Sequence, residues 1–163
     1  MGSGKTTIGT RVAAALGRPF VDNDELLRQV TGASAAEIVA RDGADALHRI
    51  EAETLLDTLG SAGTAVVAAA ASTITDARVR RALTATWVIW LRADPVTLVA
   101  RLPDSATRPF RDQDPATLVA AQSRERDRLF GEVADLMLDT GAAEADDVVA
   151  RVLASARERG LGV

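Results

Sequence analysis

The start of the chain carries the residue types that bind a nucleotide phosphate. It holds Lys5, the only lysine among 19 basic residues, while every other basic residue is arginine. The surrounding run reads Met1-Gly2-Ser3-Gly4-Lys5-Thr6-Thr7. In such a glycine-rich loop, backbone N–H groups surround the phosphates, the lysine ammonium reaches the β- and γ-phosphates, and the next hydroxyl binds Mg²⁺. A compact ammonium suits this position better than the planar guanidinium of arginine. We therefore predict a phosphate-binding loop, the alternative being a flexible Gly/Ser segment before a helix.

Two carboxylates follow a short apolar stretch further along the chain. Asp22 and Asp24 come directly after residues 19–21, which we predict to form a strand. Their i, i+2 spacing at the end of a strand would place both carboxylates on the same side. A strand end that faces a phosphate-binding loop is a suitable place for acids that meet Mg²⁺. The alternative is that these acids cap a helix and lie in a solvated turn.

Helical and extended patterns alternate along the rest of the chain. Further strands are predicted at residues 65–69, 87–91 and 136–138. Helices are predicted at residues 6–16, 25–30, 34–42, 44–59, 76–83, 94–101, 114–133 and 145–159. This alternation predicts an α/β fold with a parallel sheet flanked by helices, organised as one domain over residues 1–163. The polar segment at about 102–114 has no hydrophobic period, and we interpret it as a mobile lid.

The composition excludes several classes of function. The 163 residues include no cysteine, which excludes disulfides, thiolate metal sites and cysteine nucleophiles and suits a reducing cytoplasm. A net charge of −4 and an aromatic content of 3% argue against nucleic acid as the main partner. No apolar run is long enough to cross a membrane. We expect a cytoplasmic monomer that binds a small molecule.

These landmarks together resemble the shikimate kinase family, small P-loop kinases of the nucleoside-monophosphate-kinase-like group. The resemblance covers nearly the whole chain, and it rests on the order and spacing of several short motifs. They are Gly2 to Gly9, Phe20-Val21-Asp22-Asn23-Asp24, Thr31-Gly32-Ala33-Ser34 with Glu37-Ile38, Arg49-Ile50-Glu51, Trp90-Leu91-Arg92-Ala93, Arg108-Pro109, Arg126 with residues 129–135, and Leu138-Asp139-Thr140. The resemblance implies a P-loop NTPase fold and ATP-dependent phosphorylation of shikimate to shikimate 3-phosphate.

The resemblance also implies roles for individual residues on the nucleotide side. Gly2, Ser3, Gly4, Lys5, Thr6 and Thr7 would bind ATP, with Mg²⁺ held by Thr6 and, through water, by Asp22. Arg101 would lie beside the adenine. Arg108 would reach the phosphates from the lid, although both it and Arg111 could be ordinary loop charges.

On the substrate side, the resemblance implies that Asp24 binds the substrate hydroxyls and accepts the transferred proton. Arg126 would bind the substrate carboxylate. The alternative is that Arg124, Arg126 and Arg128, which alternate with acids, form a solvated helix face. The family's second carboxylate arginine is replaced by His48, which could instead be a surface or half-buried helix residue. The family's Gly-Gly-Gly substrate loop falls on Ala70-Ala71-Ser72. We therefore expect shikimate to bind weakly, with Ala71 and His48 altering the pocket.

The phosphate-binding motif lacks its opening. Its first glycine and the strand before it would fall ahead of Met1. In the resembled fold, that strand lies in the middle of the sheet, between the strands at Val66 and Val88. We therefore expect the natural protein to start upstream, and the 163-residue chain to fold only marginally. Two alternatives to a shikimate kinase remain: a kinase for another sugar or sugar acid, and a nucleotide-binding module without turnover.

Overall fold

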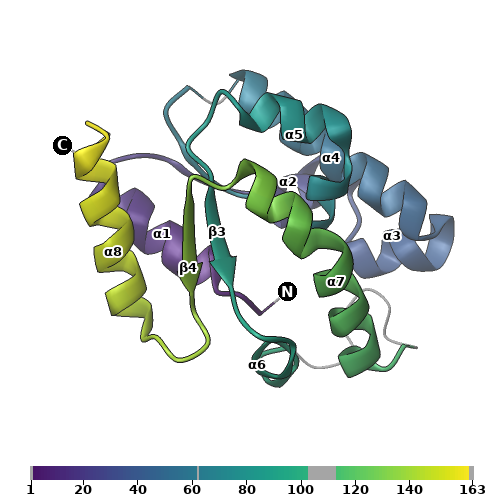
Figure 1. The fold of residues 1–163 in the computed structure, drawn as a ribbon. Helices are drawn as coiled ribbons and strands as arrows, with labels where there is room; N and C mark the ends of the chain where they lie inside the picture. The colour runs from purple at the N-terminus through teal and green to yellow at the C-terminus, as the bar shows by residue number, and fades with distance from the viewer. Residues whose placement is uncertain (1, 62, 103–112, 162–163) are drawn as a thin grey trace.

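The computed structural model describes residues 2–61, 63–102 and 113–161, in which helices and strands alternate as predicted (Figure 1). The strands are β1 (Phe20–Asp22), β2 (Val66–Ala68), β3 (Ile89–Arg92) and β4 (Leu136–Asp139). The helices are α1 (Lys5–Ala15), α2 (Asn23–Thr31), α3 (Ala35–Asp42), α4 (Ala44–Ser61), α5 (Ala77–Leu83), α6 (Pro95–Ala100), α7 (Pro115–Val133) and α8 (Ala145–Glu158), with a 3₁₀ helix η1 (Ala71–Thr75). The segment predicted as a lid lies mostly outside the described residues.

Local side-chain caps decide where several helices begin. Ser34 and Glu37 form the predicted capping box of α3, in which the Ser34 hydroxyl accepts from the Glu37 N–H and the Glu37 carboxylate accepts from the Ser34 N–H. Asp94 and Asp114 cap α6 and α7 by accepting a hydrogen bond from the N–H three residues ahead, and each is followed by a proline whose missing N–H is not needed there. These starts follow from residues within one helical turn.

The strands form two separate parallel pairs. In the first pair, β1 lies beside β2 with Val21 opposite Val67. In the second, β3 lies beside β4 with Leu91 opposite Leu138. Within the described residues, no backbone ladder joins β2 to β3. The parallel direction agrees with the α/β prediction, whereas the sheet is divided between β2 and β3.

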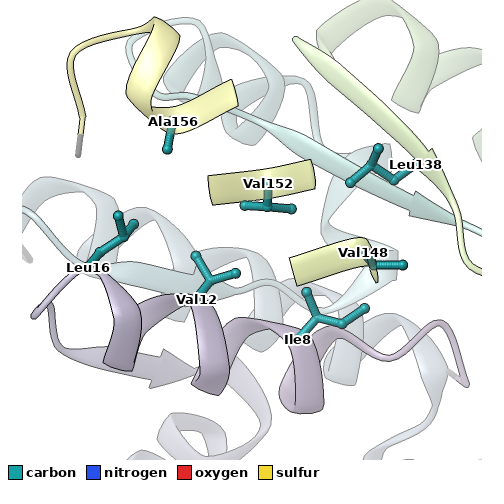
Figure 2. Close-up of a cluster of buried hydrophobic side chains, with 7 residues drawn as sticks. All are labelled: Ile8, Val12, Leu16, Leu138, Val148, Val152 and Ala156. Atoms are coloured by element: carbon teal, nitrogen blue, oxygen red, sulfur yellow. The ribbon is translucent and has the colours of Figure 1, made fainter. Parts of the chain in front are cut away.

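The largest apolar cluster holds α1 against α8 and the second strand pair. Figure 2 shows the α1 side chains directed toward those of α8, with Leu138 of β4 beside them. The buried members are Ile8, Val12, Leu16, Leu138, Val148, Val152 and Ala156. Because α1 follows the phosphate-binding loop directly, this cluster fixes the direction in which the loop faces.

Two smaller apolar clusters hold the helices on the other side of the molecule. One joins α2, α3 and α4 through Leu27, Ile38 and Leu47, and all three side chains are almost fully buried. The other packs α4 against α5 through Ala52, Leu55 and Val79. Together they fix α4, the helix that carries His48.

A cavity of about 520 Å³ lies between the two strand pairs. Val67 of β2 and Ile89 of β3 line opposite sides of it, and the ring of Trp90 stacks on Phe130 of α7 at its wall, with 5.5 Å between ring centroids. Protein interiors ordinarily contain few voids larger than one water molecule. The space between β2 and β3 is therefore far larger than a packing defect. Among the described helices, none is both long and apolar enough to cross a membrane.

Candidate active site

The loop from Gly2 to Gly4 leads into α1 with backbone angles that favour glycine. Gly2 has a φ of 76°, and a Cβ atom there would lie 2.8 Å from the Leu98 carbonyl oxygen, so a side chain at this position would collide with α6. Gly4 has a φ of 85° and stands at the N-cap of α1. In the described part of the chain, no side chain accepts a hydrogen bond at this cap. The free N–H groups at the start of α1 are therefore available to an anion.

Lys5 is the first residue of α1, and its environment changes its acidity. Burial lowers the pKa of the Lys5 ammonium below its ordinary value of 10.5. The carboxylates of Asp24, Asp22 and Glu51 act in the opposite direction. Lys5 is thus a desolvated cation that faces a group of acids. A bound phosphate would stabilise its charged form.

Thr6 and Asp22 come together at the end of β1. The Thr6 hydroxyl donates a hydrogen bond of 2.8 Å to Asp22 Oδ2, and Asp22 Oδ1 accepts one of 3.0 Å from the Asp24 N–H. Hydroxyl and carboxylate oxygens are donors that suit Mg²⁺, which usually takes one or two carboxylates together with phosphate oxygens and water. Within the described residues, no group of three or more acidic or histidine side chains forms a complete metal site. The oxygens of Thr6 and Asp22 fit one side of a Mg²⁺ site.

Asp24 lies beside this pair, but not for the reason that the strand pattern predicted. The chain leaves β1 at Asp22 and begins α2 at Asn23, so Asp24 stands in the first turn of a helix. The side chain of Asp22 caps that helix, as the alternative interpretation held, and it also accepts the bond from Thr6. The prediction that strand alternation orients both acids was therefore wrong. Asp24 is exposed at the helix start, where its charge acts on Lys5.

A second, smaller cleft of about 310 Å³ lies at the outer side of the loop. Its lining residues include Gly2, Ser3, Gly4, Thr7 and Arg101. The Arg101 guanidinium donates hydrogen bonds of 2.8 Å to the Thr140 carbonyl and 3.2 Å to the Gly141 carbonyl, so the segment after β4 holds it in place. The structure thus brings the predicted nucleotide residues together, apart from Arg108, which lies outside the described residues.

Two of the predicted substrate residues, Ala71 and Arg126, line the large cavity, whereas Asp24 and His48 are not among its lining residues. Ala71 begins η1, and Arg126 of α7 is 7% exposed; both line the large cavity together with Lys5. Burial lowers the pKa of Arg126, an effect that nearby acids oppose. His48 is half-buried on α4, and burial followed by the charge of Arg126 lowers the pKa of its imidazole. His48 and Arg126 are therefore electrostatic neighbours.

Arg49 does not take the place of the missing arginine. Its side chain is 62% exposed and pairs with Glu53 at 3.7 Å, one turn further along α4. Because successive residues of a helix point about 100° apart, Arg49 and His48 cannot face the same pocket. His48, and not Arg49, is therefore the residue that the resemblance aligns with the family's second arginine.

Glu51 is a site residue that the sequence analysis did not single out. It is 7% exposed, accepts a short hydrogen bond from the Ser72 hydroxyl, and interacts electrostatically with Asp24, Arg126 and Lys5. Burial raises the pKa of Glu51, and the bond from Ser72 opposes that effect. Glu51 stands three residues after His48 and therefore on the same helix face. That spacing was the available signal, but the partner Ser72 is visible only in the fold.

The sequence is similar to those of known proteins over nearly its whole length. A family model described as shikimate kinase matches residues 1–157. The shikimate kinase of Symbiobacterium thermophilum is 34% identical over 164 residues, which cover 98% of this chain and 94% of that protein. The shikimate kinase of Mycobacterium avium is 35% identical over 149 residues, which cover 91% of this chain and 84% of that protein.

Solved structures show the same similarity. The structure of the shikimate kinase from Acinetobacter baumannii in complex with shikimate matches with a TM-score of 0.88 at 26% identity and covers 98% of this chain and 89% of that one. The shikimate kinase from Aquifex aeolicus matches with a TM-score of 0.81 at 22% identity and covers 100% of this chain and 95% of that one, which supports the fold alone.

Proposed function

Since this chain belongs to the shikimate kinase family, we propose that it transfers the γ-phosphoryl group of ATP to a hydroxyl of shikimate and so forms shikimate 3-phosphate. The observation that carries the proposal is the charge cluster in which Lys5 and Arg126 both interact with the buried Glu51. It brings a phosphate-binding cation and a carboxylate-binding cation to one space. Phosphoryl transfer depends mainly on such positioning and charge neutralisation.

The nucleotide half of the reaction depends on the loop and its surroundings. The N–H groups at the start of α1 would bind the phosphates, and the Lys5 ammonium would contact the oxygens of the transferred group. Arg101, fixed on the carbonyls of Thr140 and Gly141, would lie beside the base in the smaller cleft. Arg108 would approach the phosphates from the lid at about 102–114, which remains a prediction.

Thr6 and Asp22 would hold Mg²⁺. The metal ion, when bound, neutralises negative charge on the phosphates as it builds up during transfer. The hydrogen bond between the two side chains keeps both oxygens at the same end of α1. With the ion bound, the Thr6 hydroxyl oxygen would contact it directly and Asp22 would hold it through water.

The acceptor half depends on Asp24 and Arg126. The Asp24 carboxylate would accept the proton of the attacking hydroxyl, whose oxygen forms the new bond to phosphorus while the bond to the ADP oxygen breaks. The Arg126 guanidinium would pair with the substrate carboxylate. Its buried position beside the cavity supports this role, because an unpaired buried cation gains most from an anionic partner.

A second candidate is the same transfer to another hydroxylated acid. His48 and Ala71 both favour it, because a histidine replaces a bidentate arginine and a side chain replaces a glycine at the substrate loop. The nucleotide half of the site is unaffected by either replacement.

A coupled assay for ADP release with purified protein tests the proposal. The acceptors would be shikimate, related hydroxy acids and sugars, each with ATP and Mg²⁺. Release that depends on shikimate and is lost in Lys5→Met supports the proposed function. Release that depends on another acid supports the second candidate, while ATP binding without release for any acceptor would identify a nucleotide-binding module.

A further inference from the structure

Ser72 is a buried hydroxyl that bonds to a buried acid. It is 7% exposed, stands in the 3₁₀ helix η1, and donates a hydrogen bond to Glu51 Oε2. Glu51 is itself 7% exposed. The helix η1 packs against both α4, which carries Glu51, and α7, which carries Arg126. Ser72 is therefore built into the junction between the acid and the cation of the proposed acceptor site.

Within the described part of the chain, Arg126 does not form an ion pair with Glu51 at this junction. Its Nε atom is buried and has no hydrogen-bond partner among the described residues. Over the same part of the chain, no salt bridge within 4.0 Å joins its guanidinium to Glu51, although the two charges influence each other. A buried carboxylate and a buried guanidinium thus lie in one cluster without pairing.

This arrangement needs a physical cause, because a buried carboxylate without a donor is costly. A nearby guanidinium is ordinarily the strongest available donor for a carboxylate. Here the Ser72 hydroxyl provides the donor instead. Because a carboxylate oxygen of Glu51 accepts the hydrogen bond from Ser72, Glu51 does not form an internal ion pair with Arg126.

We propose that Ser72 is a positioning residue that holds the Glu51 carboxylate on η1 and thereby leaves the Arg126 guanidinium free for the carboxylate of the acceptor. The inference rests on the proposed function, since Arg126 is taken there as the acceptor-binding cation. It concerns affinity for the acid and not the chemical step. Without the Ser72 hydroxyl, Glu51 pairs with Arg126. The Glu51 carboxylate then competes with the substrate carboxylate for the guanidinium.

Ser72→Ala is the test variant, and Thr75→Ala is its matched control. Thr75 lies on the same 3₁₀ helix, but its hydroxyl donates to the Ser72 carbonyl at 2.8 Å and not to Glu51. We expect Ser72→Ala to raise the KM and Kd for shikimate about 10- to 150-fold, the range for a lost charge-assisted pairing. The kcat and the KM for ATP should change less than about twofold. Thr75→Ala should leave all four values near those of the wild type.

The Glu51→Gln background separates positioning from a general packing effect. Without the charged carboxylate, no internal ion pair can form, so Ser72→Ala should have little further effect on the Kd for shikimate. An equal loss in both backgrounds, or an equal loss in Thr75→Ala, would overturn the proposal.

A substrate-free measurement distinguishes failure of this inference from failure of the proposed function. The Arg126 Nε–H signal, assigned by NMR with an Arg126→Lys variant, should exchange more slowly in Ser72→Ala and return to the wild-type rate when Glu51→Gln is added. If wild-type protein does not bind shikimate, the proposed function fails, and this signal alone decides the inference. An unchanged signal in folded Ser72→Ala would overturn it.

Discussion

The Thr6 hydroxyl donates a 2.8 Å hydrogen bond to the Asp22 carboxylate, which joins the first turn of α1 to the end of β1. The bond predicts that both side chains help to hold the same Mg²⁺, Thr6 directly and Asp22 through water. Thr6→Val should raise the Mg²⁺ concentration for half-maximal activity about 10- to 100-fold, the loss that removal of a group at a metal site typically causes. Magnesium titrations of ADP release at saturating ATP would measure it.

Thr10→Val is the matched control for that change. Thr10 stands one turn further along α1, and its hydroxyl donates to the Thr6 carbonyl at 2.8 Å without reaching Asp22. Its substitution should leave the magnesium requirement unchanged. A similar shift in both variants would mean that the effect comes from α1 as a whole.

Lys5 should react with amine reagents in a way that reports phosphate binding. It is the only lysine, so apart from the N-terminal amine there is one site of modification. Because burial lowers its pKa, more of the amine is neutral and reactive at a given pH, and the labelling midpoint should fall below 10.5. ATP with Mg²⁺ should then protect it, as shown by mass spectrometry of the labelled N-terminal peptide. Equal labelling rates with and without nucleotide would count against the phosphate-binding loop.

His48→Arg should increase the affinity for shikimate. An arginine here would restore a second guanidinium beside Arg126, worth about 1.5–3 kcal/mol, or roughly 10- to 150-fold in Kd. Isothermal titration with shikimate measures the change. Arg49→Ala is the control, because its exposed side chain pairs with Glu53 and faces away from the pocket. If His48→Arg leaves the Kd for shikimate unchanged, the natural acceptor is another acid.

Glu51 should make stability depend on pH in a definite direction. Burial raises its pKa above the ordinary 4.5, so on rising pH the unfolded state releases the proton first. Between 4.5 and the raised pKa, the native state binds more protons, and the free energy of unfolding falls as pH rises. The amide side chain in Glu51→Gln does not titrate, so the free energy of unfolding of this variant should not fall for this reason. Its stability relative to the wild type should therefore increase as pH rises.

Urea unfolding at intervals from about pH 4 to about pH 8 would measure this difference. Glu53→Gln, which removes an exposed carboxylate from the same helix, is the control. A constant difference between Glu51→Gln and the wild type over that range would contradict the prediction, as would an equal trend in the control.

The space between β2 and β3 predicts the effect of an added strand. Both strands have an apolar character and border the 520 Å³ cavity, which Ser3 also lines. An extension of about five Val, Ile and Leu residues joined ahead of Met1 could pair with both strand edges. At about 1.5–3 kcal/mol for each buried side chain, the free energy of unfolding should rise by several kcal/mol. A Gly/Ser extension of the same length, compared by thermal melting, should have no such effect.

The local sequence determined the parts of this protein that depend on neighbouring residues. The run around Lys5 predicted the glycine-rich loop and the start of α1, because both are formed by residues that are neighbours in the sequence. Ser34, Asp94 and Asp114 predicted helix starts because each cap reaches only three residues ahead. The structure confirms these starts to within one residue.

Other parts were decided only by tertiary structure. Strand alternation gave the wrong reason for the orientation of Asp24. The chain enters α2 directly after Asp22, so the helix and not the strand orients this side chain. The bond between Ser72 and Glu51 spans 21 residues, and Arg126 approaches from a third element. No local pattern encodes that meeting, because it depends on how η1 packs between α4 and α7. Residue types along the chain thus indicated the chemistry, while packing between distant segments decided which charges meet and which remain unpaired.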